Sequence, residues 1–345
     1  MREMKKRDFS KLDDKGRMTD AAARAKKLAR EHAEAMPVVQ ATGEKRERVV
    51  HAELVDPAPR GGIVEALSQW YLLKLIVRRQ LASQYAASLL GLAWSYIQPA
   101  MRFAVYYTVM GSILRLHQGT PEFAIHLFCG LVFVHYFSET WNGGTRSIWA
   151  NKSMILKMRM PREIFPLAAM MVAAYHTFPQ LLLLAIICAF KGWTITWASA
   201  GAGLLGMGIL MCFAMAMALF FSALNVFYRD FQNIVATLLQ FMHFMVPMMY
   251  PFSRIYAAAE NHPIIYNLYM ANPVAEAVVL LQRFFWWGII PESQKSGDRL
   301  VGGKVPEFPP DMWERGLITF VACFALLILA QLYFARAQNK FPERL

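Results

Sequence analysis

The chain has 345 residues, of which 56% are hydrophobic and only 17% are charged, and its formal net charge is +12. Soluble domains carry about 25% charged residues, so this composition argues against an ordinary soluble domain and favours a membrane protein. The basic residues lie mostly in the first 91 residues and in one later loop, next to apolar segments. This placement is typical of the cytoplasmic flanks of membrane helices, and nucleic acid is therefore not expected as a partner.

The first segment, residues 1–64, is polar, carries both charge signs and is interrupted by prolines and glycines. Such a segment has little apolar surface to bury, so we expect a mobile cytoplasmic tail. Residues 65–83 follow with Leu67, Trp70, Tyr71 and Leu75 at helical spacing. Trp and Tyr favour the headgroup region, so the sequence predicts an amphipathic helix lying in the inner membrane interface. A plain extension of the first membrane helix is the alternative.

Six apolar segments are long enough to cross a bilayer, which takes about 20 residues in a helix. They are residues 93–114, 123–144, 164–190, 193–221, 234–250 and 316–334. An even number of spans places both termini on one side, and the basic loop at residues 146–162 marks that side as cytoplasmic. The sequence thus predicts an all-α, polytopic protein with a six-helix membrane domain at residues 84–338. Residues 339–345 form a cytoplasmic C-terminus.

Residues 251–290 contain further apolar stretches, but Asn272-Pro273 breaks them, and Glu276, Gln282 and Arg283 interrupt the remainder. A broken helix at membrane depth is tolerated inside protein or beside a water-filled cavity. We therefore expect two short re-entrant helices that form an outer gate, rather than a seventh span. Residues 291–312 would form an external loop rich in glycine and proline.

Neither a metal site nor a catalytic site is predicted. The four cysteines, at positions 129, 188, 212 and 323, are far apart in apolar runs, which favours buried, unreactive thiols. The histidines lack the i,i+4 spacing of metal ligands. The one glycine-rich run, at residues 201–208, lacks the lysine of a phosphate-binding loop and is better explained by close helix packing.

Three stretches together carry a family resemblance. Residues 79–99 contain Tyr85, Gly91, Trp94 and Pro99; residues 151–166 contain Pro161-Arg162-Glu163; and residues 228–251 are followed by Asn272-Pro273. In order and spacing, over about residues 65–334, they resemble the membrane (permease) subunit of type-2 ABC exporters for polysaccharides. That group exports O-antigen, teichoic acid, capsule and related cell-wall glycans, and its O-antigen members are called Wzm-like. The chain departs from the family at Ala86, where a basic residue is frequent, and the tail has no counterpart.

The resemblance implies a bacterial inner-membrane homodimer that binds two copies of a separate ABC ATPase. ATP and Mg²⁺ would bind in that partner, and this chain would hold no cofactor. The substrate would be a lipid-linked polysaccharide, with membrane lipid around the protein. The resemblance also places an ATPase-coupling helix between the second and third spans. Physically, residues 147–158 can form such a helix, and a basic loop obeying the positive-inside rule is the alternative. The coupling residues would be Ser147, Ile148, Asn151, Lys152, Met154, Ile155, Lys157 and Met158.

A path for a sugar polymer needs aromatic faces, on which sugar C–H groups stack, and polar groups that replace water at the hydroxyls. Aromatic residues in membrane helices more often serve packing or interface anchoring. The candidates for lining a channel are Phe103, Tyr106, Tyr107, Tyr136, Phe241, His243 and Phe244.

Charged groups within spans mark a cavity, a pair or a function, because a charge in hydrocarbon is costly. Arg102 and Glu139 are two such groups, and a structural pair between them is one interpretation. The other interpretation is that Arg102, together with Arg78 and Arg79, attracts the pyrophosphate of a lipid-linked substrate at the inner leaflet.

Other classes of protein remain open from the sequence. A type-2 ABC exporter of drugs or lipids fits the topology but matches the three stretches less well. A membrane-embedded glycosyl- or acyltransferase would need an acidic pair or a base near the membrane face, and none is visible in the sequence. A scaffold subunit of a wall-synthesis complex would need no ATPase.

Overall fold

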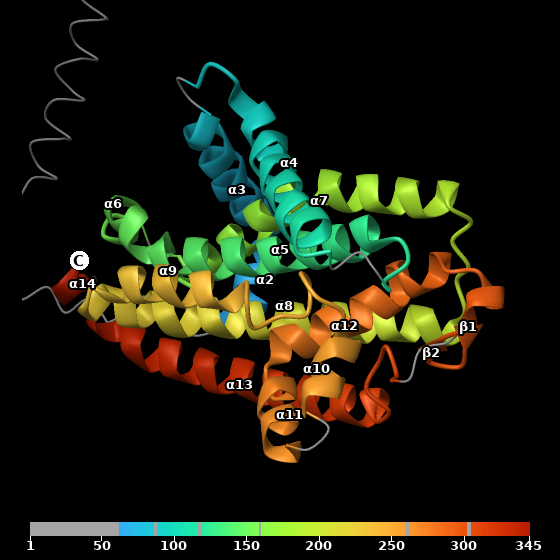
Figure 1. Ribbon diagram of the computed structural model, residues 1–345. Helices are drawn as coiled ribbons and strands as arrows, with labels where there is room; N and C mark the ends of the chain where they lie inside the picture. Colours follow the sequence, from blue (N-terminus) through green and yellow to red (C-terminus); the bar gives the residue numbers. More distant parts are fainter. Residues whose placement is uncertain (1–61, 86–87, 116–118, 159, 260–261, 302–304) are drawn as a thin grey trace, which may run out of the picture. The chain divides into compact units, whose positions relative to one another are not determined.

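The computed structural model describes residues 62–345, except 86–87, 116–118, 159, 260–261 and 302–304 (Figure 1). The predicted tail therefore lies outside the described residues, apart from its last three positions. Those three already belong to the first helix, α2 (Gly62–Ser68).

Four long apolar helices build the core. They are α5 (Phe123–Ala150), α7 (Ile164–Phe190), α8 (Trp197–Phe227) and α13 (Met312–Ala337). Each is long and apolar enough to cross a membrane. Helix α5 packs against both α7 and α8, and α13 packs against α8. The sequence predicted a helix at each of these places, and the all-α, multi-pass class is confirmed.

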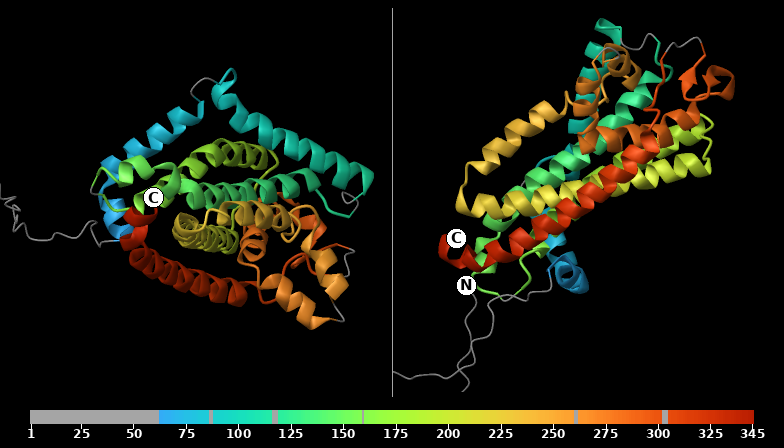
Figure 2. Two further views of the ribbon diagram at one scale, coloured as in Figure 1. Left: turned by 90° about the vertical axis from the view of Figure 1, so that its left-hand side faces the viewer. Right: turned by 90° about the horizontal axis from the view of Figure 1, so that it is seen from below.

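The chain before α5 forms two arms that meet in a corner. Helix α3 (Trp70–Tyr85) is followed by the short turn η1 (Gly91–Ala93), α4 (Trp94–Tyr106) and a π-helix, η2 (Tyr107–Ile113). Seen from the side, α3 and α4 are the arms of a V, with α7 between them (Figure 2). Leu73 and Ile76 of α3 are buried, whereas α4 buries none of its residues. The helix expected at residues 65–83 is thus two helices, and its position in the membrane interface stays a prediction.

Helix α9 (Phe231–Met242) is shorter than the expected span at residues 234–250, and that expected extent is wrong. Its 12 residues rise about 18 Å, against a hydrocarbon thickness of about 30 Å. The helix ends because Pro247 has no N–H and because side chains of a later helix take over the freed carbonyls. Gln282 Nε2 donates to the Pro247 carbonyl at 2.8 Å, and Asn272 Nδ2 donates to that of Met245 at 3.3 Å. The count of six spans stays a prediction.

The expected break at Asn272-Pro273 is present. After α10 (Phe252–Ala259), α11 (Pro263–Met270) and α12 (Pro273–Phe285) meet at a bend of 78°. Asn272 caps α12 by accepting a hydrogen bond from the Val274 N–H at 3.1 Å. Helix α12 packs closely on α8, where a Cβ added to Gly206 would lie 2.8 Å from the Ala277 carbonyl oxygen. Close packing thus explains the glycine-rich run.

The loop after α12 contains small elements. They are η3 (Trp287–Ile289), η4 (Glu292–Gln294) and an antiparallel hairpin of β1 (Lys295–Ser296) and β2 (Arg299–Leu300). Ser253 Oγ donates to Glu307 Oε2 at 3.0 Å and ties α10 to this loop. Burial raises the pKa of the Glu307 carboxyl, and the hydrogen bond from Ser253 opposes that rise.

Short helices follow α5 and α13. After α5 comes α6 (Lys152–Ile155), and after α13 come η5 (Gln338–Lys340) and α14 (Phe341–Arg344). The four cysteines are free thiols; three are buried, as the sequence predicted, and Cys212 is half-buried.

Candidate functional site

A cavity of about 400 Å³ lies between α4, α5 and α9. Lining positions recur three or four residues apart on each helix, so each helix presents one face to it. Ten residues line it: Arg102, Tyr106, Ser138, Glu139, Asn142, Ala236, Leu239, Gln240, His243 and Phe244. Six of these carry polar side chains and two are aromatic, in a region that is otherwise apolar. Polar groups at such positions mark a cavity or a pathway by default.

Two opposite charges line this cavity from different helices. Arg102 comes from α4 and Glu139 from α5. In the described part of the chain, neither side chain takes part in an ion pair within 4.0 Å. Arg102 is exposed, so its charge faces the open cavity. Sharing one cavity brings the two groups together, as the sequence suggested, but without the ion pair that one interpretation expected.

Several polar groups of the residues that line the cavity have unused hydrogen-bonding capacity. Ser138 Oγ and Asn142 Oδ1 have no hydrogen-bond partner among the described residues. His243 Nδ1 lies 2.7 Å from the Leu239 carbonyl oxygen. Because a carbonyl only accepts, Nδ1 carries the hydrogen and Nε2 remains for another partner. Hydroxyl-rich molecules need such a mixture of donors and acceptors.

The far end of the cavity is fixed by contacts with the bent helix pair. Tyr250 Oη donates to the Phe244 carbonyl at 2.6 Å and lies 3.2 Å from Tyr269 Oη. Together with the hydrogen bonds from Asn272 and Gln282, these contacts connect the end of α9 to α11 and α12. Through these contacts, a movement of α11 and α12 would also displace His243 and Phe244.

The structure places the predicted channel residues in four different surroundings. Tyr106, His243 and Phe244 line the cavity. Phe103 and Tyr107 stack on each other beside it, with ring centroids 5.8 Å apart. Tyr136 is only 6% exposed and belongs to the core, so placing it on the channel wall was wrong. Phe241 is 61% exposed and points away from the cavity lining.

Ser138, Asn142 and Gln240 line the cavity and were missed. Their signal was present in the sequence. Ser138 and Asn142 are four residues apart, and Gln240 and His243 are three apart. Polar residues at helical spacing within apolar segments point to a shared polar face.

The three arginines expected to bind a substrate phosphate together lie in three places, which corrects that expectation. Arg102 lines the cavity, and Arg78 is exposed on α3. Arg79 projects from another side of α3, where its Nη1 contacts Met154 Sδ. Successive residues of a helix point about 100° apart, so Arg78 and Arg79 cannot share one small ligand easily.

The predicted coupling helix at residues 147–158 is also different in the structure. Helix α5 continues to Ala150, and α6 has only four residues. The break lies at Asn151, whose Nδ2 donates to the Ser147 carbonyl at 2.8 Å and so caps the end of α5. Of the predicted coupling residues, four are buried: Ser147, Ile148, Asn151 and Ile155. Met154 is half-buried, and Lys152, Lys157 and Met158 are exposed.

The turn between α8 and α9 lies against this loop. Arg229 Cζ is 3.8 Å and Lys152 Nζ is 4.4 Å from the centroid of the Trp149 ring. Cation–π contacts of this kind join the two segments into one surface.

A family model described as ABC-2 type transporter matches residues 71–285, which include all three stretches that carry the resemblance. The chain belongs to this family. It is 27% identical over 224 residues to the O-antigen export system permease protein RfbA of Myxococcus xanthus, covering 65% of this chain and 83% of that protein. Two proteins of the same name from Klebsiella pneumoniae are 26% and 24% identical. They cover 52% and 64% of this chain, and 68% and 82% of their own lengths. The protein is thus a multi-pass membrane subunit of a transporter.

In this ABC-2 subunit, Pro161-Arg162-Glu163 is a structural anchor. Arg162 and Glu163 are both buried at the start of α7. Arg162 Nη1 donates to the Gln338 carbonyl, and Glu163 Oε1 accepts from Gln331 Nε2 at 2.9 Å. The motif therefore fixes α7 to the last turns of α13 and to η5. Burial lowers the pKa of the Arg162 guanidinium, and the neighbouring Glu163 opposes that change.

Proposed function

We propose that the chain is the permease of an ATP-driven exporter that moves a lipid-linked polysaccharide from the cytoplasmic to the outer side of the bacterial inner membrane. Two copies of the chain would form the membrane unit, with both termini cytoplasmic. Two copies of a separate ABC ATPase would bind ATP and Mg²⁺ and drive it.

The cavity between α4, α5 and α9 carries this proposal. A glycan passing through a membrane must exchange water for hydrogen bonds, or its hydroxyls pay a desolvation cost. Asn142, Gln240 and His243 line the cavity and can supply such partners. Tyr106 and Phe244 supply aromatic faces. The names of the relatives support the same class of cargo, because those proteins are called O-antigen export permeases.

The bent pair α11–α12 suits the role of an outer gate. Its 78° bend and its contacts with the end of α9 support a re-entrant pair that closes the cavity on the outer side. We infer that opening it requires the hydrogen bonds from Asn272 and Gln282 to the 245–247 backbone to change.

The loop at residues 146–162 and the Arg229 turn form the proposed docking surface for the ATPase. Leu156 and Met158 are 53% and 52% exposed and give an apolar centre. Lys152 and Lys157 give a charged rim, the usual arrangement of a protein interface.

The export function is tested by deleting the gene and complementing it with a plasmid copy. The deletion strain should lose surface glycan that reacts with a label added outside the cells, and lipid-linked glycan should accumulate in its membranes. Complementation should restore both. A deletion strain that displays normal surface glycan, or that changes only in drug sensitivity, would contradict the proposal.

The docking surface predicts that the double variant Leu156→Asp and Met158→Asp lowers ATPase co-purification at least tenfold. Two carboxylates in an apolar interface centre lose burial and add a desolvation cost of about 2 kcal/mol or more. Both side chains are exposed in the chain itself, so its abundance should stay normal.

A control is Val301→Asp, which places one carboxylate on an apolar residue that is 63% exposed and directly follows β2. It should leave co-purification unchanged. Undiminished ATPase binding by the Leu156 and Met158 double variant would contradict the proposed position of the docking surface.

A further inference from the structure

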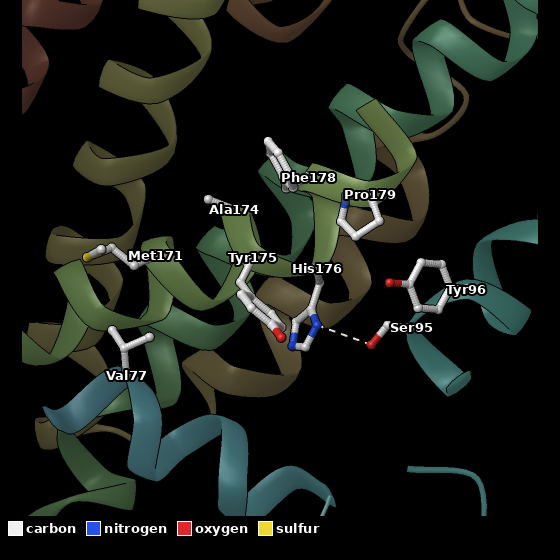
Figure 3. Close-up of a pocket in the computed structure, with 9 residues that line it drawn as sticks. All are labelled: Val77, Ser95, Tyr96, Met171, Ala174, Tyr175, His176, Phe178 and Pro179. Carbon is white, nitrogen blue, oxygen red and sulfur yellow. Dashed lines mark hydrogen bonds between the residues drawn. The ribbon is translucent and has the colours of Figure 1, made fainter. Parts of the chain in front are cut away.

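A second cavity, of about 480 Å³, forms a groove between the arms of the V and α7 (Figure 3). One end lies at Val77 of α3 and Met171 of α7, and the other lies at Phe178 and Pro179. Met171 and Pro179 are eight residues apart, so the groove follows α7 for about 12 Å. Its walls are mostly apolar, and it is separate from the cavity around Arg102.

Hydrogen bonds across the corner fix the width of the groove. Tyr85 Oη lies 2.6 Å from Ser95 Oγ, and both lie 3.1 Å from His176 Nδ1. On the opposite side of the ring, His176 Nε2 lies 3.0 Å from Gln84 Oε1. This network joins α3, α4 and α7 and satisfies its own polar groups. The groove is therefore preformed, and what it offers a ligand is mainly apolar surface.

Two unpaired cations stand at the Val77 end. On a helical wheel, Lys74 and Arg78 lie on the same side of α3, within about 100° of Val77, whereas Arg79 points to α6. Both Lys74 and Arg78 are exposed, and within the described residues neither forms an ion pair. Positive charge at one end of an apolar groove matches a molecule with an anionic head and a hydrocarbon chain.

We propose that the groove binds one chain of an anionic glycerophospholipid from the surrounding bilayer, with its phosphate held by Lys74 and Arg78. A water molecule occupies about 30 Å³ of liquid, and a methylene group is of nearly the same size. The groove of about 480 Å³ therefore has room for on the order of sixteen such groups, which is about the length of one acyl chain. Such a lipid would fill the preformed space between α3, α4 and α7. The proposal needs a membrane-spanning chain, but it does not depend on which cargo is exported.

The test uses the full-length chain in nanodiscs of mixed phosphatidylcholine and phosphatidylglycerol. Native mass spectrometry then counts the lipids retained after release into detergent. The wild type should retain phosphatidylglycerol in preference to phosphatidylcholine. Lys74→Ala and Arg78→Ala should each lower this preference about fivefold, as expected for one cation near a lipid surface.

A groove-filling variant provides the second arm. Ala174→Trp places an indole in the groove and should abolish retention of one lipid. Leu204→Trp is the matched control, because Leu204 is 77% exposed on α8, away from the groove. Thermal unfolding of each variant checks that it folds, and the two cation variants test the proposal even if Ala174→Trp does not fold.

Three results would overturn the proposal. They are equal retention of the two lipids, unchanged retention in a folded Ala174→Trp variant, and displacement of phosphatidylglycerol by an equal mole fraction of undecaprenyl phosphate. The last result would assign the groove to a carrier lipid instead.

Discussion

Replacing Arg102 with alanine is expected to lower polysaccharide export at least tenfold while the amount of protein in the membrane stays normal. Arg102 is exposed to the cavity and, among the described residues, forms no ion pair, so folding does not depend on it. A lipid-linked substrate carries phosphate, and a hydrogen bond to a charged group contributes about 1.5–3 kcal/mol. Losing it corresponds to a tenfold to hundredfold effect. Export is measured as glycan reachable by an external label.

The charge of Glu139 requires a control of its own. Removing Arg102 takes away one of the two basic residues that act on the Glu139 carboxylate, the other being Arg146, and that loss by itself can impair export. The double variant Arg102→Ala, Glu139→Gln separates the two causes. If Arg102 binds substrate, the double variant exports as poorly as the single one. If the double variant recovers, Arg102 serves only to neutralise Glu139. Lys191→Ala, at an exposed ion pair with Glu122, should stay within twofold of the wild type.

Helices whose ends depend on local sequence were predicted well. The predicted span at residues 164–190 coincides with α7, which begins just after Pro161 and ends before Gly192, a residue with φ of 81°. A proline near the start and a glycine after the end are local signals that need no tertiary contact. The same logic found the break between α11 and α12, because Asn272 and Pro273 together cap and start a helix.

Features that depend on distant partners were not predictable from the sequence. The backbone just after α9 is held by Asn272 and Gln282, which lie 27 and 35 positions beyond the carbonyls that they bind. The sequence alone does not distinguish Tyr136 from other aromatic residues of membrane helices, and only the packing of α5 shows that it faces the core. Arg78, Arg79 and Arg102 were expected to act together because the sequence does not show in which direction the chain turns between α3 and α4. The polar face of Ser138 and Asn142, in contrast, was visible as helical spacing.

Gly144 is expected to tolerate no side chain, and Gly144→Ala should destabilise the protein by about 1–3 kcal/mol or more. A Cβ at this position would lie 2.9 Å from the Cα of Ala218 on α8, and closer still to its Cβ. The contact is with backbone, so no flexible side chain can yield. Helix α5 also packs on α7, so it cannot retreat from α8 without losing that contact. Membrane abundance and the midpoint of thermal unfolding in detergent measure the loss.

The neighbouring Gly143 supplies the control, because a Cβ there would meet Ala169 at 3.5 Å, an ordinary van der Waals distance. Replacing glycine with alanine in a helix is by itself favourable by about 1 kcal/mol. Gly143→Ala should therefore be neutral or stabilising, and the opposite sign at Gly144 can come only from the close contact with Ala218. Equal stability of the two variants would mean that α5 and α8 are not packed this closely. Asn142, next to the two glycines, lines the cavity, and Thr145 accepts a hydrogen bond from Asn225 of α8 at 3.1 Å. The tight packing of α5 on α8 thus sets the position of one cavity wall relative to the loop proposed to bind the ATPase.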